Sequence, residues 1–416
     1  MRVGLMTQID YWVGIPLCFL LSLVNRVLRL FLPAPSRNNR PQKLLFIKLS
    51  EMGGIILSYP LVRRVQEEYP DAKMFFLTFA SNKSLLEVLK MVPAQNIVII
   101  DDKSPYAFIQ DAVSALQRIR KERIDVCFDL EFFSRFTAIL SYLSGAAKRI
   151  GFYRYTLEGL YRGNLLTHNI LYNPHLHMSQ MFLCLGQDLE IHGKVTPELE
   201  RVPEAIAASA PRFIPTQRQK EEMRDRLKGL GVRADARILF VNPGEGRLPL
   251  REWPWNNFVV LVRNLLELEN HYILIVGTSG CSGRLRQFDN ELKHERCINL
   301  SGKTSILELL TFLTMGAALI ANDSGLVHLA SLTSIQQFIF FGPESPRVFA
   351  PLGDHAHIFY SGFSCSPCFS AYNHRRSVCK DNRCLKVITP DEAYNVISKK
   401  IALEASIHSR QASSSE

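Results

Sequence analysis

The chain has 416 residues, 47% of them hydrophobic, which is enough for two buried cores, so we predict two domains. Its formal net charge of +10 implies an anionic partner: a nucleic acid, a membrane surface or a phosphorylated substrate. Nucleic acid is the least favoured of these, because the sequence has no dense basic stripe with interleaved aromatic residues and no nucleic-acid motif. The nine cysteines are too dispersed for a disulfide scaffold, which fits a reducing compartment.

The N-terminus carries a long apolar run. Residues 11–25 contain no charge, and residues 27–32 continue the apolar pattern beyond Arg26. The uncharged run is shorter than the roughly 20 residues that an uninterrupted span needs, and Asp10 stands where a cleaved signal would be positively charged. We therefore predict an uncleaved helix embedded in the membrane or lying on it, with a short spanning anchor or a helix packed on the protein itself as alternatives. The positive-inside tendency places the body of the protein in the cytosol, because basic residues follow the run: Arg26, Arg29, Arg37, Arg40 and Lys43.

A series of strands and helices follows a polar linker at 33–42. We predict a buried strand at 43–49, a glycine-containing turn at 50–54 and an amphipathic helix at 55–69. Further strands are predicted at 73–79, 96–101, 125–130, 149–153 and 165–171, with helices at 81–92, 106–121 and 178–191. Alternation of this kind predicts a parallel α/β sheet.

A second series of the same kind begins after a connecting segment at 195–235. Its predicted elements are a strand and turn at 237–246, a helix at 255–268, a strand at 272–277, a loop and helix at 301–315, strands at 317–321 and 337–341, and a final helix at 389–404. The predicted fold class is therefore α/β, with two Rossmann-like domains facing across a cleft. The predicted division is a membrane-associating helix and linker at 1–42, domains at 43–194 and 236–404, and a disordered tail at 405–416.

The most informative stretch is 317–330, in which a short apolar strand leads through the turn 322–325 into a helix. Such a turn presents unpaired backbone N–H groups and the positive end of the helix dipole to one crevice, and both favour a phosphate. Open parallel sheets bind ligands at this carboxyl edge. Two other interpretations stay open: Asp323 or Ser324 as a simple helix cap, and His328 as a buried core residue.

Five motifs stand out along the two series: Lys48–Pro60, Asn242–Gly244 with Arg251–Pro254, Leu300–Ser305, Asn322–Ala330 and Phe341–Pro343. Together they resemble the ADP-heptose:lipopolysaccharide heptosyltransferases, glycosyltransferase family 9. The resemblance covers roughly residues 43–402 and implies the GT-B type of two-domain α/β fold. It also implies a nucleotide-sugar donor bound mainly by the C-terminal domain, an acceptor bound by the N-terminal domain, and an inverting, metal-independent transfer.

The resemblance assigns donor binding to residues of the second series: Asn242, Gly244, Arg251, Asp323, Ser324, Gly325, Leu326 and His328. A diphosphate leaving group needs its growing charge stabilised, which backbone N–H groups at 324–326 would do. Arg251 stands where the family has a basic residue and can grip a phosphate bidentately; a solvated charge before a buried tryptophan is its other interpretation. Asp323 is a poor neighbour for a phosphate and is expected to cap the helix or hold sugar hydroxyls, while His328 would orient the donor.

The sequence departs from the family at the expected catalytic base. The family's Ser-x-x-Gly-Asp pattern ends in an aspartate thought to be the base, and Gly54 takes that place here. Because glycine accepts no proton, the base is expected to be Glu51 in the same turn or Glu131 after the strand at 125–130, with Asp129 as a less favoured third. A surface or capping carboxylate is the alternative interpretation of each.

A basic run follows that region: Lys148, Arg149, Arg154 and Arg162. Such a run is usually a solvated face. Here Arg149 and Arg154 are predicted to meet the phosphates and acidic sugars of a lipid-linked acceptor.

Four cysteines gather near the C-terminus, with His374 nearby: Cys365, Cys368, Cys379 and Cys384. A pair spaced as C-x-x-C followed by two further cysteines suggests a structural zinc site, although the spacing is irregular. The other five are predicted to be inert core thiols: Cys18, Cys127, Cys184, Cys281 and Cys297.

The sequence therefore predicts a glycosyltransferase that is peripheral or monotopic on the cytoplasmic face of the inner membrane. It would move a sugar, with heptose from ADP-heptose as the favoured donor, onto a lipid-linked lipopolysaccharide core acceptor, and would require no cofactor for catalysis. Two alternatives stay open. A non-catalytic relative that binds a nucleotide-sugar or glycolipid would explain Gly54. A metal-binding interaction module would explain the cysteine cluster but not the two α/β halves.

Overall fold

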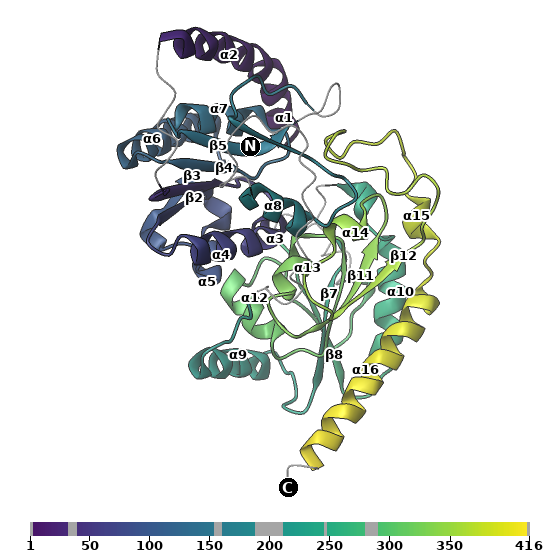
Figure 1. Ribbon diagram of the computed structural model, residues 1–416. Helices are drawn as coiled ribbons and strands as arrows, with labels where there is room; N and C mark the ends of the chain where they lie inside the picture. The colour runs from purple at the N-terminus through teal and green to yellow at the C-terminus, as the bar shows by residue number, and fades with distance from the viewer. Residues whose placement is uncertain are drawn as a thin grey trace. The chain divides into compact units, whose positions relative to one another are not determined.

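The computed structural model describes residues 3–31, 40–153, 160–187, 211–244, 248–278 and 290–413 (Figure 1). The chain divides into two compact units. The N-terminal unit comprises Met1–Ser209 together with the short segment Ser370–Arg375, and the C-terminal unit comprises Ala210–Phe369 and Arg376–Glu416. The boundary at 209/210 falls inside the connecting segment predicted at 195–235. The sequence did not predict that residues 370–375 belong to the N-terminal unit.

The N-terminal unit is built on a six-stranded parallel sheet of order β3-β2-β1-β4-β5-β6. Its strands are β1 Lys43–Ile47, β2 Lys73–Phe79, β3 Ile97–Ile100, β4 Val126–Asp129, β5 Lys148–Tyr153 and β6 His168–Leu171. Its connecting helices are α3 Met52–Leu57, α4 Tyr59–Glu68, α5 Lys83–Leu89, α6 Pro105–Glu122, α7 Arg135–Leu143 and α8 Met178–Gln187, with 3₁₀ turns η1 Ala80–Asn82 and η2 Ala94–Asn96. The helix predicted at 55–69 is two helices, because Pro60 starts a new helix and cannot continue the preceding one.

The N-terminal apolar run forms two helices, α1 Val3–Trp12 and α2 Gly14–Phe31, and both pack on α7 (Figure 1). The break lies at Val13, beside Gly14 and close to Pro16. Gly and Pro have the lowest helix propensities, so both favour a break in the helix at this point. α2 is long and apolar enough to cross a membrane by length and composition, but only 17% of it is buried in the protein.

The C-terminal unit repeats the same topology in a second parallel sheet of order β12-β11-β10-β7-β8-β9. Its strands are β7 Arg237–Asn242, β8 His271–Ile275, β9 Cys297–Asn299, β10 Ala318–Asn322, β11 Gln336–Phe341 and β12 Ala356–Tyr360. Its helices are α9 Gln217–Gly229, α10 Trp255–Leu266, α12 Ile306–Leu313, α13 Gly325–Ala330, α14 Pro346–Phe349, α15 Arg383–Lys386 and α16 Pro390–Ser413, with the 3₁₀ turn η3 Pro249–Arg251. In each sheet the strand order reverses beside the first strand, which is where open α/β sheets bind ligands.

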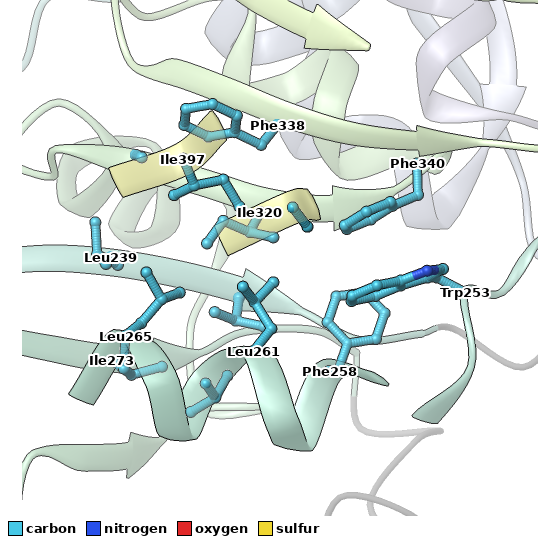
Figure 2. Packing of buried hydrophobic residues seen from close by; sticks show 14 of the residues in the cluster. Leu239, Trp253, Phe258, Leu261, Leu265, Ile273, Ile320, Phe338, Phe340 and Ile397 are labelled. Carbon is cyan, nitrogen blue, oxygen red and sulfur yellow. The ribbon is translucent and has the colours of Figure 1, made fainter. Parts of the chain in front are cut away.

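Aromatic stacking positions the loop before α10. Trp253 is buried and stacks on Phe340 of β11 with ring centroids 4.1 Å apart, while Phe258 of α10 meets it edge-on (Figure 2). The indole N–H donates to the Ile388 carbonyl at 2.8 Å. A buried tryptophan fixed by both its ring and its N–H holds the neighbouring Arg251 at the edge of the sheet.

The predicted α/β class with two Rossmann-like units is confirmed by the two parallel sheets. Two edge strands escaped prediction, β9 and β12, because strands of three to five residues at a sheet edge carry little apolar signal. The prediction that the tail is disordered from residue 405 is wrong as far as 413, since α16 continues to Ser413. The stretch 391–413 contains neither proline nor glycine, so nothing in it ends the helix.

Candidate functional site

The turn between β1 and α3 in the N-terminal unit contains a buried ion pair. Lys48 is completely buried, and its Nζ lies 2.7 Å from Oε2 of Glu131, which follows β4. The other carboxylate oxygen of Glu131 accepts from the backbone N–H groups of Leu49 and Ser50 at 2.9 and 3.0 Å. A carboxylate that accepts three charge-assisted hydrogen bonds is held in one orientation. Glu131, one of the two predicted bases, therefore ties the loop after β4 to the β1–α3 turn.

Glu51, the other predicted base, lies in the same turn with a different environment. Its side chain is 37% exposed, and one carboxylate oxygen is 3.6 Å from Lys48 Nζ. It also forms an ion pair with Arg375, which reaches it from the segment Ser370–Arg375 of the same unit. The backbone of Glu51 adopts φ 67°, in the left-handed region that a glutamate rarely occupies. Backbone strain of this kind concentrates at functional sites.

Aromatic contacts hold the segment that carries Arg375. The Tyr372 ring stacks on Phe133 and meets Tyr172 edge-on, and its hydroxyl donates to the Tyr172 carbonyl at 2.8 Å. No local pattern predicts the contact between Arg375 and Glu51, because 324 residues separate them along the chain.

Asp129, the third acid considered, is fully buried at the end of β4. It forms an ion pair with Arg162 and accepts from the Thr137 hydroxyl at 3.0 Å. Burial lowers the pKa of Arg162 to about 10, so its guanidinium stays protonated at neutral pH. Because both Asp129 and Arg162 are buried, this pair has no access to a substrate.

The carboxyl edge of the second sheet is organised by two asparagines. The Asn322 side chain accepts from the backbone N–H of Trp253 at 2.8 Å and donates to the Pro243 carbonyl at 2.9 Å. Asn242 donates to the Val276 carbonyl at 2.8 Å. These bonds connect the segments that follow β7, β8 and β10. The sequence analysis placed Asn322 in a motif but assigned it no role.

Arg251 and Asp323 meet at this edge. Arg251 Nη2 lies 2.7 Å from Oδ1 of Asp323, whose side chain is almost fully buried, whereas Arg251 is partly exposed. Within the described part of the chain, neither Asp323 Oδ2 nor Arg251 Nε has a hydrogen-bond partner beyond this ion pair. Buried polar atoms without partners are rare, and they indicate a site that a ligand or water completes.

The remaining donor-binding candidates lie beside this pair. Ser324 caps α13 by accepting from the Leu326 N–H at 3.3 Å, so that N–H already has a partner. Gly325 is the first residue of the helix, and His328 is buried within it. A Cβ at Gly244 would lie 3.2 Å from the Glu252 carboxyl carbon, so a side chain at 244 would crowd Glu252.

The sequence model of glycosyltransferase family 9 (heptosyltransferase) matches residues 115–378, more than half of the chain. The chain belongs to glycosyltransferase family 9. Among curated relatives, it is 28% identical over 143 residues to lipooligosaccharide heptosyltransferase 2 of Haemophilus influenzae, covering 34% of this chain and 41% of the relative. It is 26% identical over 119 residues to lipopolysaccharide heptosyltransferase 2 of Escherichia coli, covering 28% and 34%. The chain therefore spans less than half the length of these two relatives.

Solved structures extend the likeness over most of the chain. The structure of E. coli ADP-heptose lps heptosyltransferase II matches with a TM-score of 0.67 at 20% identity and covers 87% of this chain and 99% of that one. The glycosyltransferase family 9 structure from Veillonella parvula matches with a TM-score of 0.69 at 14% identity, covering 88% and 99%. At such identities the likeness establishes the fold, which is that of the GT-B-like heptosyltransferases.

The structure gives a physical reason for glycine at position 54 of this family 9 member. A Cβ at Gly54 would lie 2.5 Å from Lys48 Cε and 3.3 Å from its Nζ. The Lys48 side chain thus fills the space into which a side chain at 54 would project. Without a Cβ at 54, Lys48 reaches Glu131.

The predicted acceptor contacts need correction at Arg149. Its guanidinium is buried and donates to the carbonyls of Leu165 and Ala146 at 2.7 and 2.6 Å. It lies over the Tyr142 ring, and burial lowers its pKa. The guanidinium of Arg149 therefore bonds to backbone segments inside the N-terminal unit, because β5 directs the side chain between them. Arg154 lies outside the described residues.

The four C-terminal cysteines lie in the C-terminal unit without forming a ligand set. Burial and the neighbouring thiols of Cys368, Cys379 and Cys365 raise the pKa of Cys384, which shows that the four lie near one another. Across the described ranges, no three His, Cys, Asp or Glu side chains are arranged to hold a metal ion. The zinc site stays a prediction without geometric support.

The other five cysteines are predicted to be inert core thiols because they lie in or beside apolar runs of the sequence. Cys18 and Cys127 are fully buried, and burial raises their pKa values to about 11 and about 12. Thiols with such pKa values are almost entirely protonated at neutral pH and therefore unreactive. Cys184 and Cys297 are half-buried, and Cys281 lies outside the described residues.

Proposed function

We propose that this member of glycosyltransferase family 9 is an inverting transferase that moves heptose from ADP-heptose onto a lipid-linked lipopolysaccharide core acceptor. The observation that carries the proposal is the Arg251–Asp323 pair, whose remaining polar atoms have no partner among the described residues. The matched relatives are named heptosyltransferases, and one matched structure is that of an ADP-heptose lps heptosyltransferase.

In the proposed donor site Arg251 binds the diphosphate. Its guanidinium is partly exposed, and Asp323 orients it through one nitrogen, which leaves other N–H groups for phosphate oxygens. A fixed cation stabilises the charge that develops on the leaving diphosphate. The negative charge of Asp323 would repel the phosphates. Its second oxygen is therefore proposed to accept from a sugar hydroxyl. We propose that no metal ion is needed, since Arg251 supplies the positive charge.

Glu51 is the proposed base. It takes the proton of the acceptor hydroxyl while that oxygen forms a bond to the anomeric carbon and the bond to the diphosphate breaks, releasing ADP. Glu51 is preferred to Glu131 because its side chain is 37% exposed, whereas the Glu131 carboxylate is nearly buried and accepts from two backbone N–H groups of the turn. Lys48 and Arg375 on either side of its carboxylate hold it in place.

The proposed acceptor partner is a lipid-linked oligosaccharide, bound by the N-terminal unit at the cytoplasmic face of the inner membrane. Arg154 remains a proposed contact for the acceptor's phosphates, whereas Arg149 does not. A structural zinc ion at the cysteine cluster is a separate proposal, which metal analysis of the purified protein tests.

The deciding experiment incubates the purified protein with ADP-heptose and a heptose-deficient core lipid and measures ADP release. Release that depends on the acceptor supports the transfer. A rise in melting temperature with ADP-heptose but no release would identify the non-catalytic alternative that Gly54 suggests. A melting temperature raised by a UDP, GDP or CMP sugar and not by ADP-heptose would show that the proposed donor is wrong.

A further inference from the structure

We propose that α1 and α2 form a platform that lies in the plane of a membrane surface, docked to the N-terminal unit by one face and inserted among anionic phospholipids by the other. The platform binds the bilayer without crossing it. This inference concerns the orientation of the helices and holds whether or not the protein transfers a sugar.

Polar contacts hold α2 to the protein along one stripe. Asn25 is buried, and its amide donates to the Asn164 carbonyl at 3.1 Å. The Ser22 hydroxyl accepts from the Asn164 N–H and donates to the Cys18 carbonyl, each at 2.7 Å. These three α2 residues follow a helical spacing, so they share one face. At the neighbouring Gly163, with φ 67°, a Cβ would lie 2.7 Å from the Cys18 carbonyl oxygen, so only glycine lets the loop approach so closely.

The same face packs against apolar side chains of α7 and the 161–165 segment. Cys18 is fully buried in a cluster with Ala138, Ile139 and Leu165. At the start of α2, a Cβ on Gly14 would lie 2.8 Å from Arg135 Cβ, which shows how closely the two helices approach. The docked face is thus a packed interface within the unit.

α1 is fixed by a charge. One Asp10 carboxylate oxygen accepts from the backbone N–H groups of Arg135 and Phe136 at 2.9 Å each, at the start of α7. The other lies 3.1 Å from Nη1 of Arg135. A carboxylate on the unsatisfied N–H groups of a helix start is favoured by hydrogen bonding and by the helix dipole. Asp10, which argued against a cleaved signal, therefore anchors the platform.

The opposite side of the two helices is apolar and exposed. The exposed fractions reach 73% at Trp12, 64% at Phe19, 54% at Leu20, 53% at Leu23 and 79% at Phe31. Other exposed apolar residues on these helices are Ile9, Tyr11, Val13, Leu17, Val24, Val27, Leu28 and Leu30. An apolar surface of this extent on a soluble protein marks a contact with a membrane or a partner.

Charge and aromatic content commit the surface to lipid. Arg26 is exposed beside the apolar residues, where it can meet anionic headgroups. Tyr11 and Trp12 pack edge to face at the other end, and such residues favour the membrane interface.

A spanning arrangement conflicts with the docked face. α2 has 18 residues and is about 27 Å long, close to the thickness of the hydrocarbon core, so its contacts and not its length decide its orientation. Crossing would place Ser22, Asn25 and Arg26 in lipid and would break the bonds to Asn164. Lying flat keeps these bonds and covers the apolar side.

The first test is flotation of the full-length protein with vesicles of phosphatidylethanolamine and phosphatidylglycerol. We expect Leu20→Glu with Leu23→Glu to reduce vesicle binding about tenfold or more, because the change removes two apolar side chains from the inserted surface and adds two charges that anionic lipids repel. The matched control, Gln110→Glu with Gln117→Glu, adds the same charge at exposed positions of α6 and should bind normally. Equal binding by both variants, or self-association in place of vesicle binding, overturns the proposal.

The second test separates lying from crossing by fluorescence quenching with brominated lipids. In a Trp12→Phe background, Leu23→Trp places a reporter near the middle of α2. We expect bromine near the headgroups to quench it more than bromine near the bilayer centre. Stronger quenching from the bilayer centre would show a spanning helix and overturn the proposal. The Trp12→Phe protein that keeps Leu23 measures the background fluorescence from Trp253 and Trp255.

Discussion

The two sheets present the same arrangement at their carboxyl edges, with opposite consequences. In the N-terminal unit Glu131 binds Lys48 and two backbone N–H groups, so both carboxylate oxygens have partners. In the C-terminal unit Asp323 meets Arg251 through Oδ1, and its Oδ2 has no hydrogen-bond partner among the described residues. An ion pair with every polar atom bonded holds two segments together, whereas one with unused capacity is prepared for a ligand. Topology therefore does not reveal which edge pair binds substrate.

Glu51 should show the largest effect, because it is the carboxylate near the first pair that reaches solvent. We expect Glu51→Gln to lower kcat about 100-fold to 10,000-fold, the usual contribution of a general base. The shift in melting temperature with ADP-heptose should be unchanged, because Glu51 does not bind the donor. Glu67→Gln on the exposed face of α4 is the control. A variant at Glu51 with normal kcat would rule it out as the base.

Arg251→Lys tests the second pair while keeping its charge. Lysine still neutralises Asp323 but lacks the planar fork, so we expect kcat/KM for the donor to fall about 10-fold to 100-fold. The melting temperature without ligand should stay close to that of the parent protein. Arg263→Lys, an exposed position on α10, should have no effect on either measurement. Unchanged kcat/KM in the Arg251 variant would show that this pair serves structure alone.

Glu131→Gln should act on stability. The change removes the carboxylate 2.7 Å from the ammonium of fully buried Lys48 and leaves the Glu51 carboxylate at 3.6 Å, so we expect a loss of up to about 3–5 kcal/mol, the usual cost of breaking a buried pair. Urea unfolding monitored by circular dichroism measures this loss. Glu122→Gln is the matched control, since its carboxylate meets Lys43 and Lys73 at the surface and should cost at most about 1 kcal/mol. A Glu131 variant as stable as the control would contradict the proposed structural role.

Gly54→Ala gives the smallest expected change. The added methyl group would crowd the Lys48 side chain, which costs about 1–3 kcal/mol, while alanine in a helix regains about 1 kcal/mol. We expect a net loss of about 1 kcal/mol in the free energy of unfolding. Gly229→Ala in α9, where a Cβ meets nothing within 4 Å, should instead be neutral or stabilising. A gain of stability at both positions would show that Lys48 does not occupy this space.

Local signals in the sequence located most elements, including the strand, turn and helix proposed to bind the donor. The strand, turn and helix around 317–330 was recognised because apolar runs, turn residues and helix caps are written in neighbouring positions. The same signals did not assign roles to the acids. Glu51, Asp129 and Glu131 carry the same chemical group near the end of a strand, and nothing in their immediate neighbours separates a base from a structural carboxylate.

The apolar N-terminus shows the same limit. Composition indicated a membrane-seeking helix, and the structure adds that one face is already occupied by Asn164 and Arg135 of the protein. A hydropathy pattern counts apolar residues but does not show which of them are covered.

The sequence by itself determined the two parallel sheets, their family and the turn proposed to receive the donor, because periodicity and turn chemistry act over a few residues. Only the tertiary structure decided that Lys48 binds Glu131 across 83 positions, that Arg375 reaches Glu51 and that Asp10 caps α7. These partners lie far apart along the chain, and electrostatic and hydrogen-bonding partners are fixed by distance in space. A carboxylate's role therefore emerges only when the folded chain brings its partners to it.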